Sequence, residues 1–414
     1  MQRILFLTRI LPLAGTPGGD MPILNYQMKA LNTTDKVIDL LFLKRKKSDI
    51  EKIKESKEFF GFNEYFYAGI EPKINLRCLS DWVFKKRSYI FNRFYSKSYS
   101  NKLLELVKTG DYNTLVFITS YMYINVALNK ALQNEIKNRN IKCVLGVTVL
   151  EYMVRDKYLS NNGDNISLIK KYILQREQRL LKDIELSFIK RADRNYLVGK
   201  EEYDFICKIL SEHKEKIYLL EIIPSIEEYF YSVPEKEEQN SIYFVGSYSW
   251  SPNVDAVKYF VKNIFPSILE RNKTIKFYII GIRASEEIKN LHDGKNIFFM
   301  GEVKSVFDEI QKYSVLVVPL RIGGGTRLKI LESIAWGKAV VTTSIGSEGI
   351  NLHGESPVIL ADEPKVFAAK VVELLENNSA RIELKEAARN FALKYYILDK
   401  FRDNMLEILE FEQS

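Results

Sequence analysis

The chain has 414 residues, of which 46% are hydrophobic and 28% are charged. This length predicts two domains of about 200 residues each, and the composition excludes disordered, collagen-like and disulfide-dense proteins. Cys78, Cys143 and Cys207 are far apart in sequence and fit no metal-ligand spacing, so we expect free thiols in a reducing compartment and no metal site.

The net charge of +8 is concentrated in the first half of the chain. Residues 1–220 contain 38 Lys and Arg against 25 Asp and Glu, a net charge of +13, and the remainder has a net charge of −5. Basic residues cluster at Lys44–Lys47 and at Lys85–Arg87, the second cluster among aromatic residues. This pattern predicts contact with an anionic membrane surface. A solvated basic face explains it equally well, and no recognisable nucleic-acid module accompanies it.

The most apolar segments of the first half predict strands and helices of a globular core. Arg3 and Arg9 interrupt the apolar run Met1–Leu13, which favours a first strand over a signal peptide. The longest uncharged span, Tyr112–Asn129, contains several polar residues and favours a strand followed by a helix over a membrane span. We therefore expect a cytoplasmic protein, with the inner face of the membrane as its candidate contact.

Strands and helices alternate through the first half, which is typical of a doubly wound parallel sheet. The predicted strands are Ile4–Thr8, Val37–Leu43, Glu64–Ala68, Thr114–Thr119, Cys143–Val149, Asn195–Val198 and Ile217–Ile223. The predicted helices are Met21–Leu31, Trp82–Val107, Ile124–Asn138, Ile166–Lys190 and Lys200–Leu210. The loop Gly15–Asp20 joins the first strand to a helix, which is where open α/β sheets bind ligands.

A second set of strands begins after the segment Ile223–Asn240, whose prolines and acidic residues are typical of a hinge or linker. The predicted strands are Ile242–Val245, Ile275–Gly281, Ile297–Gly301, Val315–Leu320, Ala339–Thr343 and Val358–Ala361. Ser251 and Pro252 predict the N-cap and first turn of a helix after the first of them. The last helix, around Leu398–Phe411, follows the completed second sheet and could cross back to the first domain.

The stretch Pro319–Gly349 combines a strand end, a glycine loop and a helix. The glycines at 323–325 permit a tight bend and a close approach of the backbone to a ligand. A helical apolar pattern begins at Thr326, and Gly337 predicts its end. A glycine loop that leads into a helix N-terminus presents unpaired N–H groups, which suits a phosphate.

Charged side chains at the start of this helix strengthen that interpretation. Arg327 lies in the first turn, where a cation opposes the helix dipole unless it shares an anion with the helix. Lys329 adds a second cation, and Glu332 lies about one turn further along, where it could accept hydrogen bonds from ribose hydroxyls. An ordinary strand–loop–helix unit with a solvated Arg327 and a surface Glu–Lys pair is the alternative.

Several motifs resemble the family-4 retaining glycosyltransferases of GT-B fold. They are Phe244-Val245-Gly246, Pro252-Asn253-Val254-Asp255, Pro319-Leu320 with the loop from Gly323 to Glu332, and Gly346-Ser347-Glu348-Gly349. The resemblance is specific over Ile242–Tyr396, whereas in the first half only Arg191-Ala192-Asp193-Arg194 and Gly18-Gly19 carry it. It implies an α/β protein with two Rossmann-like doubly wound domains facing a central cleft. We expect an acceptor-binding domain over 1–223, a nucleotide-sugar-binding domain over 224–397, and a helix over 398–414 that packs back on the first domain.

The resemblance also implies roles for the residues of the second domain. Glu332 matches the carboxylate that binds the donor ribose, and Arg327 and Lys329 match the cations that hold the diphosphate, so these three are the expected catalytic residues. Gly246 would lie under the donor phosphates. Backbone amides of the loop are expected to complete the donor site: Gly324, Gly325 and Thr326. No metal and no cofactor are implied beyond the nucleotide-diphosphate-sugar, which is the donor substrate.

The first domain would supply the acceptor side. Gly18 and Gly19 match the loop that closes over the reacting sugar, and Asp20 or Glu151 could supply a carboxylate there. The chain departs from the family in two respects. Gly324 occupies the place where many relatives have a glutamate that contacts the transferred sugar, and the first domain contains no histidine.

The resemblance predicts a retaining glycosyltransferase that moves a sugar from a nucleotide-diphosphate-sugar to a glycan, lipid-linked or protein-linked acceptor. Cell-surface polysaccharide or glycoconjugate synthesis is the expected setting. The alternative is a catalytically silent homologue that serves as the acceptor-binding subunit of an active enzyme. The glycine-loop motif is wrong for a GT-B epimerase or phosphorylase.

Overall fold

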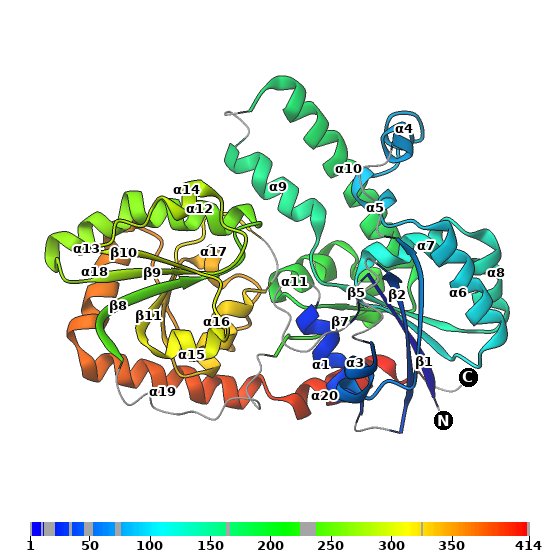
Figure 1. The fold of residues 1–414 in the computed structure, drawn as a ribbon. Helices are drawn as coiled ribbons and strands as arrows, with labels where there is room; N and C mark the ends of the chain where they lie inside the picture. The colour runs from blue at the N-terminus through cyan, green and yellow to red at the C-terminus, as the bar shows by residue number, and fades with distance from the viewer. Residues whose placement is uncertain are drawn as a thin grey trace. The chain divides into compact units, whose positions relative to one another are not determined.

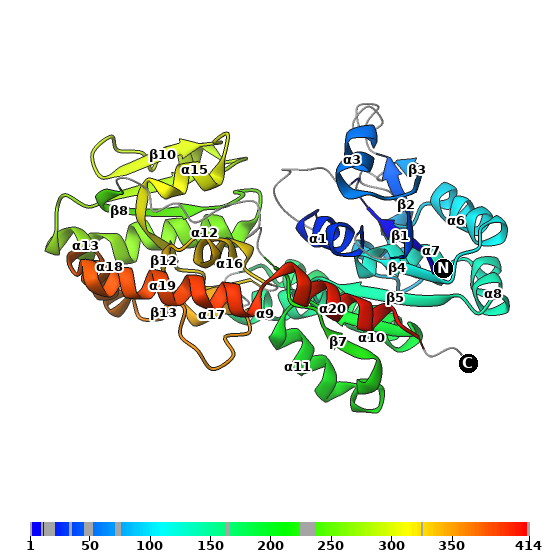
Figure 2. The ribbon, with the colours of Figure 1, turned by 90° about the horizontal axis from the view of Figure 1, so that it is seen from below.

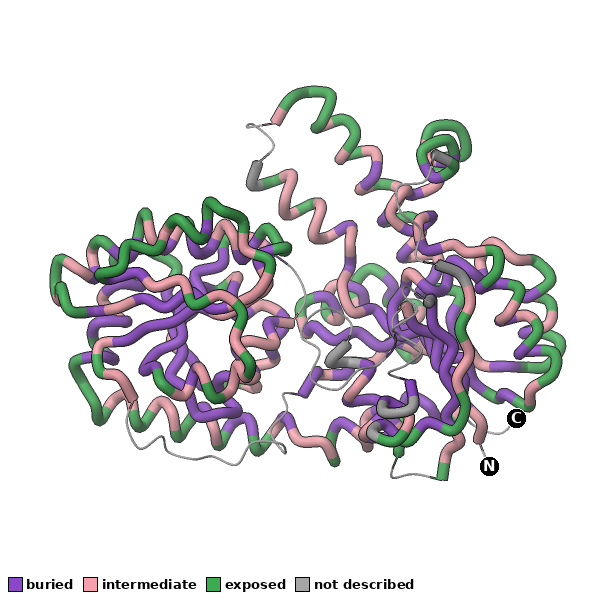
Figure 3. Tube along the Cα trace, viewed as in Figure 1, coloured by how far each residue is buried: buried purple, intermediate pink, exposed green. Residues whose placement is uncertain are grey.

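The computed structural model describes residues 2–9, 11, 21–32, 35–44, 53–70, 76–162, 166–223, 237–323 and 326–411 (Figure 1). The chain forms two compact units, one of Met1–Glu221 with Leu398–Ser414 and one of Ile222–Ile397. Each unit has its own parallel sheet, and buried residues are concentrated along the strands of both sheets (Figure 3).

The first unit contains a seven-stranded parallel sheet in the order β3-β2-β1-β4-β5-β6-β7. The strands are β1 Arg3–Thr8, β2 Val37–Lys44, β3 Glu64–Ile70, β4 Thr114–Phe117, β5 Lys142–Val147, β6 Arg194–Leu197 and β7 Ile217–Leu219. The strand order reverses between β1 and β4, so the loops that follow these two strands meet at a topological switch point, where such sheets bind ligands.

The helices of the first unit differ from the predicted ones mainly in where they break. They are α1 Met21–Asn32, α3 Ile53–Phe60, α4 Leu76–Phe84, α5 Tyr89–Asn92, α6 Lys97–Thr109, α7 Ile124–Ala127, α8 Lys130–Asn138, α9 Glu151–Asn162, α10 Leu168–Arg191 and α11 Lys200–Ile209. The single predicted helix Trp82–Val107 is wrong. Ser88 caps α5 by accepting from Phe91 N at 3.3 Å, and Ser96 caps α6 by accepting from Tyr99 N at 3.3 Å. These hydroxyls start new helices because they satisfy N–H groups that a continuous helix would bond internally.

A third polar cap divides the helix predicted over Ile124–Asn138. Asn129 accepts a hydrogen bond from Leu132 N at 3.1 Å and begins α8. Helices α3 and α9 were not predicted from the sequence, whereas α1, α10 and α11 lie within two residues of the predicted bounds.

The second unit contains a six-stranded parallel sheet in the order β10-β9-β8-β11-β12-β13. The strands are β8 Glu238–Val245, β9 Lys276–Ile280, β10 Ile297–Gly301, β11 Tyr313–Val318, β12 Ala339–Thr342 and β13 Ile359–Leu360. All six predicted strands are therefore confirmed. The switch point lies between β8 and β11, so the loop after Val245 and the loop after Val318 converge at one edge of the sheet.

The helices of the second unit connect these strands. They are α12 Ser251–Tyr259, α13 Phe265–Arg271, α14 Glu286–Lys289, α15 Val306–Gln311, α16 Leu328–Ala335, α17 Ser344–Ser347, α18 Pro364–Glu376 and α19 Asn378–Tyr395. Helix α12 begins at Ser251, so Trp250 is its N-cap in place of the predicted Ser251, and Pro252 lies in its first turn. Gly337 ends α16 with φ +71° and donates to Ile334 O at 3.0 Å, which confirms the predicted stop.

The last helix, α20 Leu398–Leu409, packs on the first unit beside α1 (Figure 2). The rings of Tyr26 and Phe401 lie 6.5 Å apart, edge to face, and Gln2 Nε2 donates to Leu409 O at 3.1 Å. The guanidinium of Arg194 donates to Glu407 O and lies 4.5 Å from the ring centroid of Phe411. The motif that ends in Arg194 therefore holds the terminal helix.

No helix in the described part of the chain is long and apolar enough to span a bilayer. The same residues contain no group of three His, Cys, Asp or Glu side chains placed to hold a metal ion.

Candidate functional site

The loops that meet at the switch point of the second unit bring together the end of β8 and the start of α16. Gly246 follows β8, and its N–H donates to Ile280 O at 3.1 Å. A Cβ atom at Gly246 would lie 2.7 Å from Asn253 Nδ2 and 2.9 Å from Lys329 Nζ. Because glycine has no Cβ atom, position 246 leaves room for the side chains of Lys329 and Asn253 to contact each other.

Gly281 fixes the position of that loop from the neighbouring strand end. Its φ is +142°, and a Cβ atom there would lie 1.8 Å from Gly246 O. Only glycine adopts this conformation without strain, and only glycine permits the two backbones to come this close.

We expect Gly281→Ala to lower the free energy of unfolding by about 2–4 kcal/mol, because it combines overpacking with backbone strain. Gly354→Ala is the matched control, since Gly354 also has a positive φ, +76°, but no atom lies within 4 Å of its built Cβ. The control should lose only about 1 kcal/mol. Denaturant unfolding followed by tryptophan fluorescence measures both losses, and equal losses would show that the contact with Gly246 is unimportant.

Lys329 lies in the first turn of α16 and is only partly exposed. Its Nζ donates to Asn253 Oδ1 at 2.7 Å and lies 4.0 Å from the ring centroid of Phe244. Burial, together with the nearby charge of Arg327, lowers the pKa of Lys329 well below its ordinary value. Within the part of the chain that the structure describes, no carboxylate lies within ion-pair distance of Lys329. The charge of Glu332 offsets the shift only in part, and a bound anion would supply further counter-charge.

Arg327 is the N-cap of α16, one residue before the predicted first turn, and it is 3% exposed. Its guanidinium lies 5.5 Å from the ring centroid of Trp250, and its Nη2 donates to Ile345 O at 3.4 Å. A Cβ atom at Gly323 would lie 2.8 Å from the same Nη2, so this glycine permits the guanidinium to pass close to the loop. Arg327 is therefore held against the protein and does not extend into solvent.

The N-terminus of α16 has no side-chain cap and is flanked by two cations. Leu328 N donates to Thr326 O at 3.2 Å and Ile330 N donates to Arg327 O at 2.9 Å, but no side-chain acceptor compensates the positive end of the helix dipole at the N-cap. Two basic side chains next to such an end form an arrangement that binds phosphate.

Glu332 lies one turn along α16 and is also partly exposed. Burial raises the pKa of its carboxyl to about 7, against the smaller opposite effect of Lys329. Among the described residues, its carboxylate has no hydrogen-bond or ion-pair partner. Its oxygens can therefore accept hydrogen bonds from hydroxyl groups of a ligand.

The remaining residues predicted for this site are placed only in part. Thr326 Oγ1 donates to Gly349 O at 3.2 Å, which joins the glycine loop to the Gly346–Gly349 motif. Gly324 and Gly325 lie outside the described residues. No role was predicted from the sequence for Asn253, Trp250 or Phe244. The position of Asn253 in the first turn of α12, directly after the switch-point strand, was the available signal for it.

The predicted acceptor-side residues belong to the first unit, where Gly18, Gly19 and Asp20 lie outside the described residues. Glu151 begins α9, directly after β5, and Tyr121 Oη donates to Glu151 Oε1. The ring of Tyr121 lies 4.5 Å from that of Phe94, and the guanidinium of Arg9 lies 5.5 Å from the Phe94 centroid. These residues follow or pack near the carboxyl ends of β1, β4 and β5.

Glu185 of α10 binds the backbone at Glu151, and no role was predicted for it from the sequence. It is 1% exposed and accepts hydrogen bonds from Glu151 N at 2.9 Å and Tyr152 N at 3.1 Å. Burial raises the pKa of Glu185 to about 8. Its carboxyl caps the N-terminus of α9 and so fixes the residue that carries the Glu151 side chain.

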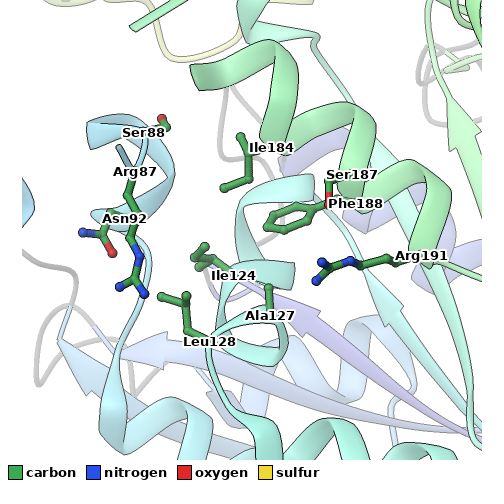
Figure 4. Close-up of a pocket in the computed structure, with 10 residues that line it drawn as sticks. All are labelled: Arg87, Ser88, Asn92, Ile124, Ala127, Leu128, Ile184, Ser187, Phe188 and Arg191. Atoms are coloured by element: carbon green, nitrogen blue, oxygen red, sulfur yellow. The ribbon is translucent and has the colours of Figure 1, made fainter. Parts of the chain in front are cut away.

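A separate cavity of about 200 Å³ lies in the first unit between α5, α7 and α10 (Figure 4). The figure shows Arg87 and Arg191 on opposite sides of an apolar floor that includes Ile124, Leu128 and Phe188. None of the predicted site residues lines it. The cavity is smaller than the roughly 300–1,000 Å³ of most ligand pockets, and we do not assign it to the candidate site.

Comparisons with known proteins show what the sequence and the fold are similar to. Residues 239–377 match the family model described as Glycosyl transferases group 1. A Klebsiella pneumoniae protein described as an uncharacterized 44.6 kDa protein in the cps region is 26% identical over 412 residues, with 96% of this chain and 97% of the relative covered.

Two solved structures share the whole fold. HepE from Anabaena, crystallised with UDP, superposes with a TM-score of 0.66 at 12% identity, covering 99% of both chains. A mutant of S. aureus TarM, crystallised with UDP, Fondaparinux and alpha-GlcNAc-glycerol, superposes with a TM-score of 0.69 at 10% identity, covering 99% of this chain and 100% of TarM. The chain therefore has the predicted GT-B fold, and residues 239–377 of its second unit match the glycosyltransferase group 1 model.

Proposed function

We propose that this protein is a retaining glycosyltransferase of family 4 that transfers a sugar from a nucleotide-diphosphate-sugar to a glycan, lipid-linked or protein-linked acceptor. One observation carries the proposal. Lys329, without a carboxylate within ion-pair distance among the described residues, lies beside Arg327 at a helix N-terminus that has no side-chain cap. The group 1 domain and the UDP present in crystals of HepE and TarM support a nucleotide-sugar donor. The cps region named for the Klebsiella relative supports a role in cell-surface polysaccharide synthesis.

The proposed mechanism follows from the charge that develops during transfer. As the bond between the anomeric carbon and the diphosphate oxygen breaks, positive charge grows on the sugar and negative charge grows on the diphosphate. Arg327, Lys329 and the positive end of the α16 dipole stabilise the departing diphosphate as preorganised electrostatic groups. The acceptor oxygen bonds to the same face of the anomeric carbon, and its proton passes to the departing phosphate oxygen. Glu332 orients the donor by accepting from the ribose hydroxyls.

On the acceptor side, we propose that Glu151 contacts the incoming hydroxyl group or its sugar. Its position after β5 and its hydrogen bond from Tyr121 support this role. We also propose that Gly18, Gly19 and Asp20 belong to the loop that closes over the reacting sugar. The proposed location is the cytoplasm, with contact at the inner face of the membrane through the basic first unit, and the proposed reaction requires neither a metal nor a cofactor.

The pH dependence of donor binding should be bell-shaped. The pKa of Glu332 is raised to about 7, and the ribose hydroxyls need its ionised form, so affinity should rise as the pH increases through 7. The pKa of Lys329 is lowered, and the diphosphate needs its protonated form. As the pH rises further, affinity should therefore fall again, and this fall should come at a lower pH than the ordinary titration range of lysine. Calorimetry with UDP-glucose from about pH 5.5 to 8.5 measures the acid limb and the start of the alkaline limb, because neither the phosphates nor the uracil ring titrates there.

Two variants assign the limbs to their residues. Glu332→Gln should abolish the acid limb, and Lys329→Arg should abolish the alkaline limb because arginine stays protonated. A flat profile for the unmodified protein would contradict the roles of both residues.

A silent acceptor-binding subunit is the second candidate, and the histidine-free first unit favours it. A thermal-shift screen of UDP-, GDP-, ADP- and dTDP-sugars, followed by a hydrolysis assay on each donor that binds, separates the two. The transferase should bind one donor class and hydrolyse it slowly. A protein that binds none of these donors would be the silent subunit.

A further inference from the structure

Apolar side chains are exposed together on α4 and the start of α10 in the first unit. Both helices project from the rest of the unit (Figure 1). We call this surface the α4–α10 patch. Its apolar members are Leu79, Val83, Phe84, Leu168, Ile169, Tyr172 and Ile173. Phe84, Leu168 and Ile169 are 81%, 84% and 76% exposed, far beyond the single exposed apolar residues that are ordinary on a protein surface.

Direct contacts hold the two helices of the patch together. Arg176 Nη2 donates to Trp82 O at 2.8 Å and to Val83 O at 3.0 Å, and its guanidinium lies 4.5 Å from the ring centroid of Trp82. The next residue, Glu177, accepts from Ser88 Oγ at 2.7 Å and from Ile90 N at 3.0 Å. These contacts join segments more than 80 residues apart in sequence, at a point about two turns along α10 from Leu168 and Ile169.

The charges around the patch are almost all positive. Residues 76–87 and 167–179 contain eight Lys and Arg against two Asp and Glu. Both carboxylates are buried, since Glu177 caps α5 and Asp81 is 1% exposed. Asp81 pairs with Lys85 at 2.7 Å and with Arg87 at 3.3 Å. Lys86, Lys170 and Lys171 have no ion-pair partner among the described residues, so the exposed charge of the patch is cationic.

Exposed aliphatic and aromatic side chains surrounded by lysine and arginine are typical of surfaces that enter the headgroup layer of an anionic bilayer. The central part of a protein–protein interface is instead depleted of lysine, whereas four lysines lie within these two segments. The composition therefore favours a lipid surface over a second protein.

We propose that the α4–α10 patch is the surface through which this protein binds an anionic lipid bilayer. The apolar side chains enter the headgroup layer, and the surrounding lysines contact lipid phosphates. This inference rests on the proposed function in one respect, which is that the protein meets its acceptor at a membrane. It adds the residues that make the contact.

Vesicle flotation with the full chain tests this proposal. The protein should bind phosphatidylcholine vesicles that contain phosphatidylglycerol, and the triple variant Phe84→Ser, Leu168→Ser, Ile169→Ser should bind them roughly tenfold or more weakly. The matched control is Val366→Ser, Ile382→Ser, Leu393→Ser, which removes three exposed apolar residues of the second unit and should bind as the unmodified protein does. Lys170→Gln with Lys171→Gln should also weaken binding about tenfold or more, and only to the anionic vesicles.

Further measurements keep the outcomes distinct. Thermal midpoints and UDP-glucose affinities of the patch variants should equal those of the unmodified protein, so that a loss of vesicle binding is not unfolding. Vesicle binding without binding of any UDP-, GDP-, ADP- or dTDP-sugar would leave the patch intact and contradict the proposed function. Equal losses in the patch and control variants would overturn the proposal. So would a dimer in light scattering that the patch variant converts to a monomer, with no vesicle binding by either.

Discussion

Replacing Arg327 by alanine should weaken UDP binding by about 10–150-fold, which corresponds to about 1.5–3 kcal/mol for the loss of a charged hydrogen bond. The guanidinium is held by Trp250 and Ile345 O next to the N-terminus of α16, so its position is set before a ligand binds. Losing it removes one of the two cations that the diphosphate would contact. Isothermal titration calorimetry of the unmodified protein and the variant gives the two affinities directly.

Arg321→Ala is the matched control because Arg321 lies on the same loop. Its guanidinium is already neutralised, with Nε donating to Asp255 Oδ2 at 3.0 Å, and it is half exposed. The control should bind UDP as the unmodified protein does. Arg327 is buried, so thermal melts must show that the alanine variant is folded. Unchanged affinity in a folded Arg327→Ala protein, or equal losses in both variants, would remove Arg327 from the site.

Glu332→Gln should weaken UDP by about tenfold or more and leave inorganic pyrophosphate within about twofold of its original affinity. The carboxylate has no partner among the described residues and lies one turn from the two cations, where a ribose joined to the diphosphate would lie. Pyrophosphate has no ribose to lose a contact. Removing the negative charge of Glu332 should favour pyrophosphate binding, because the ligand is itself an anion. Competition of both ligands against a fluorescent nucleotide measures the two affinities under one set of conditions.

Lys329→Gln is the comparison variant, for which we expect no difference between the two ligands. It removes a contact to the diphosphate, so it should weaken UDP and pyrophosphate by similar factors. If Glu332→Gln also weakened both ligands equally, its contact with the ribose would be ruled out.

The parallel sheets could be predicted because strands covered on both faces are continuous apolar runs. All six residues of β11 and all four of β4 and β12 are buried, and these were among the clearest strands in the sequence. Helix ends were harder to predict, since one polar side chain decides whether a helix continues. Ser88, Ser96 and Asn129 each bond a backbone N–H and start a new helix inside a region with helical spacing.

The composition of the candidate site was predictable, but its geometry was not. Arg327, Lys329 and Glu332 belong to one helix start, so their spacing alone places them together. The contact of Lys329 with Asn253 joins residues 76 positions apart, and the burial of Arg327 depends on Trp250 and on the absence of a side chain at Gly323. Glu185 supports Glu151 from 34 positions away and belongs to no motif. Such contacts follow from tertiary packing, which local spacing does not encode.

A crystal structure of the full chain with UDP-glucose would locate the diphosphate. We expect it at the switch point of the second sheet, beside the N-terminus of α16 and within hydrogen-bond distance of Lys329 Nζ and the Arg327 guanidinium, with the ribose hydroxyls on Glu332. A diphosphate bound at any other place, or one that leaves Lys329 on Asn253 and contacts neither cation, would contradict this expectation.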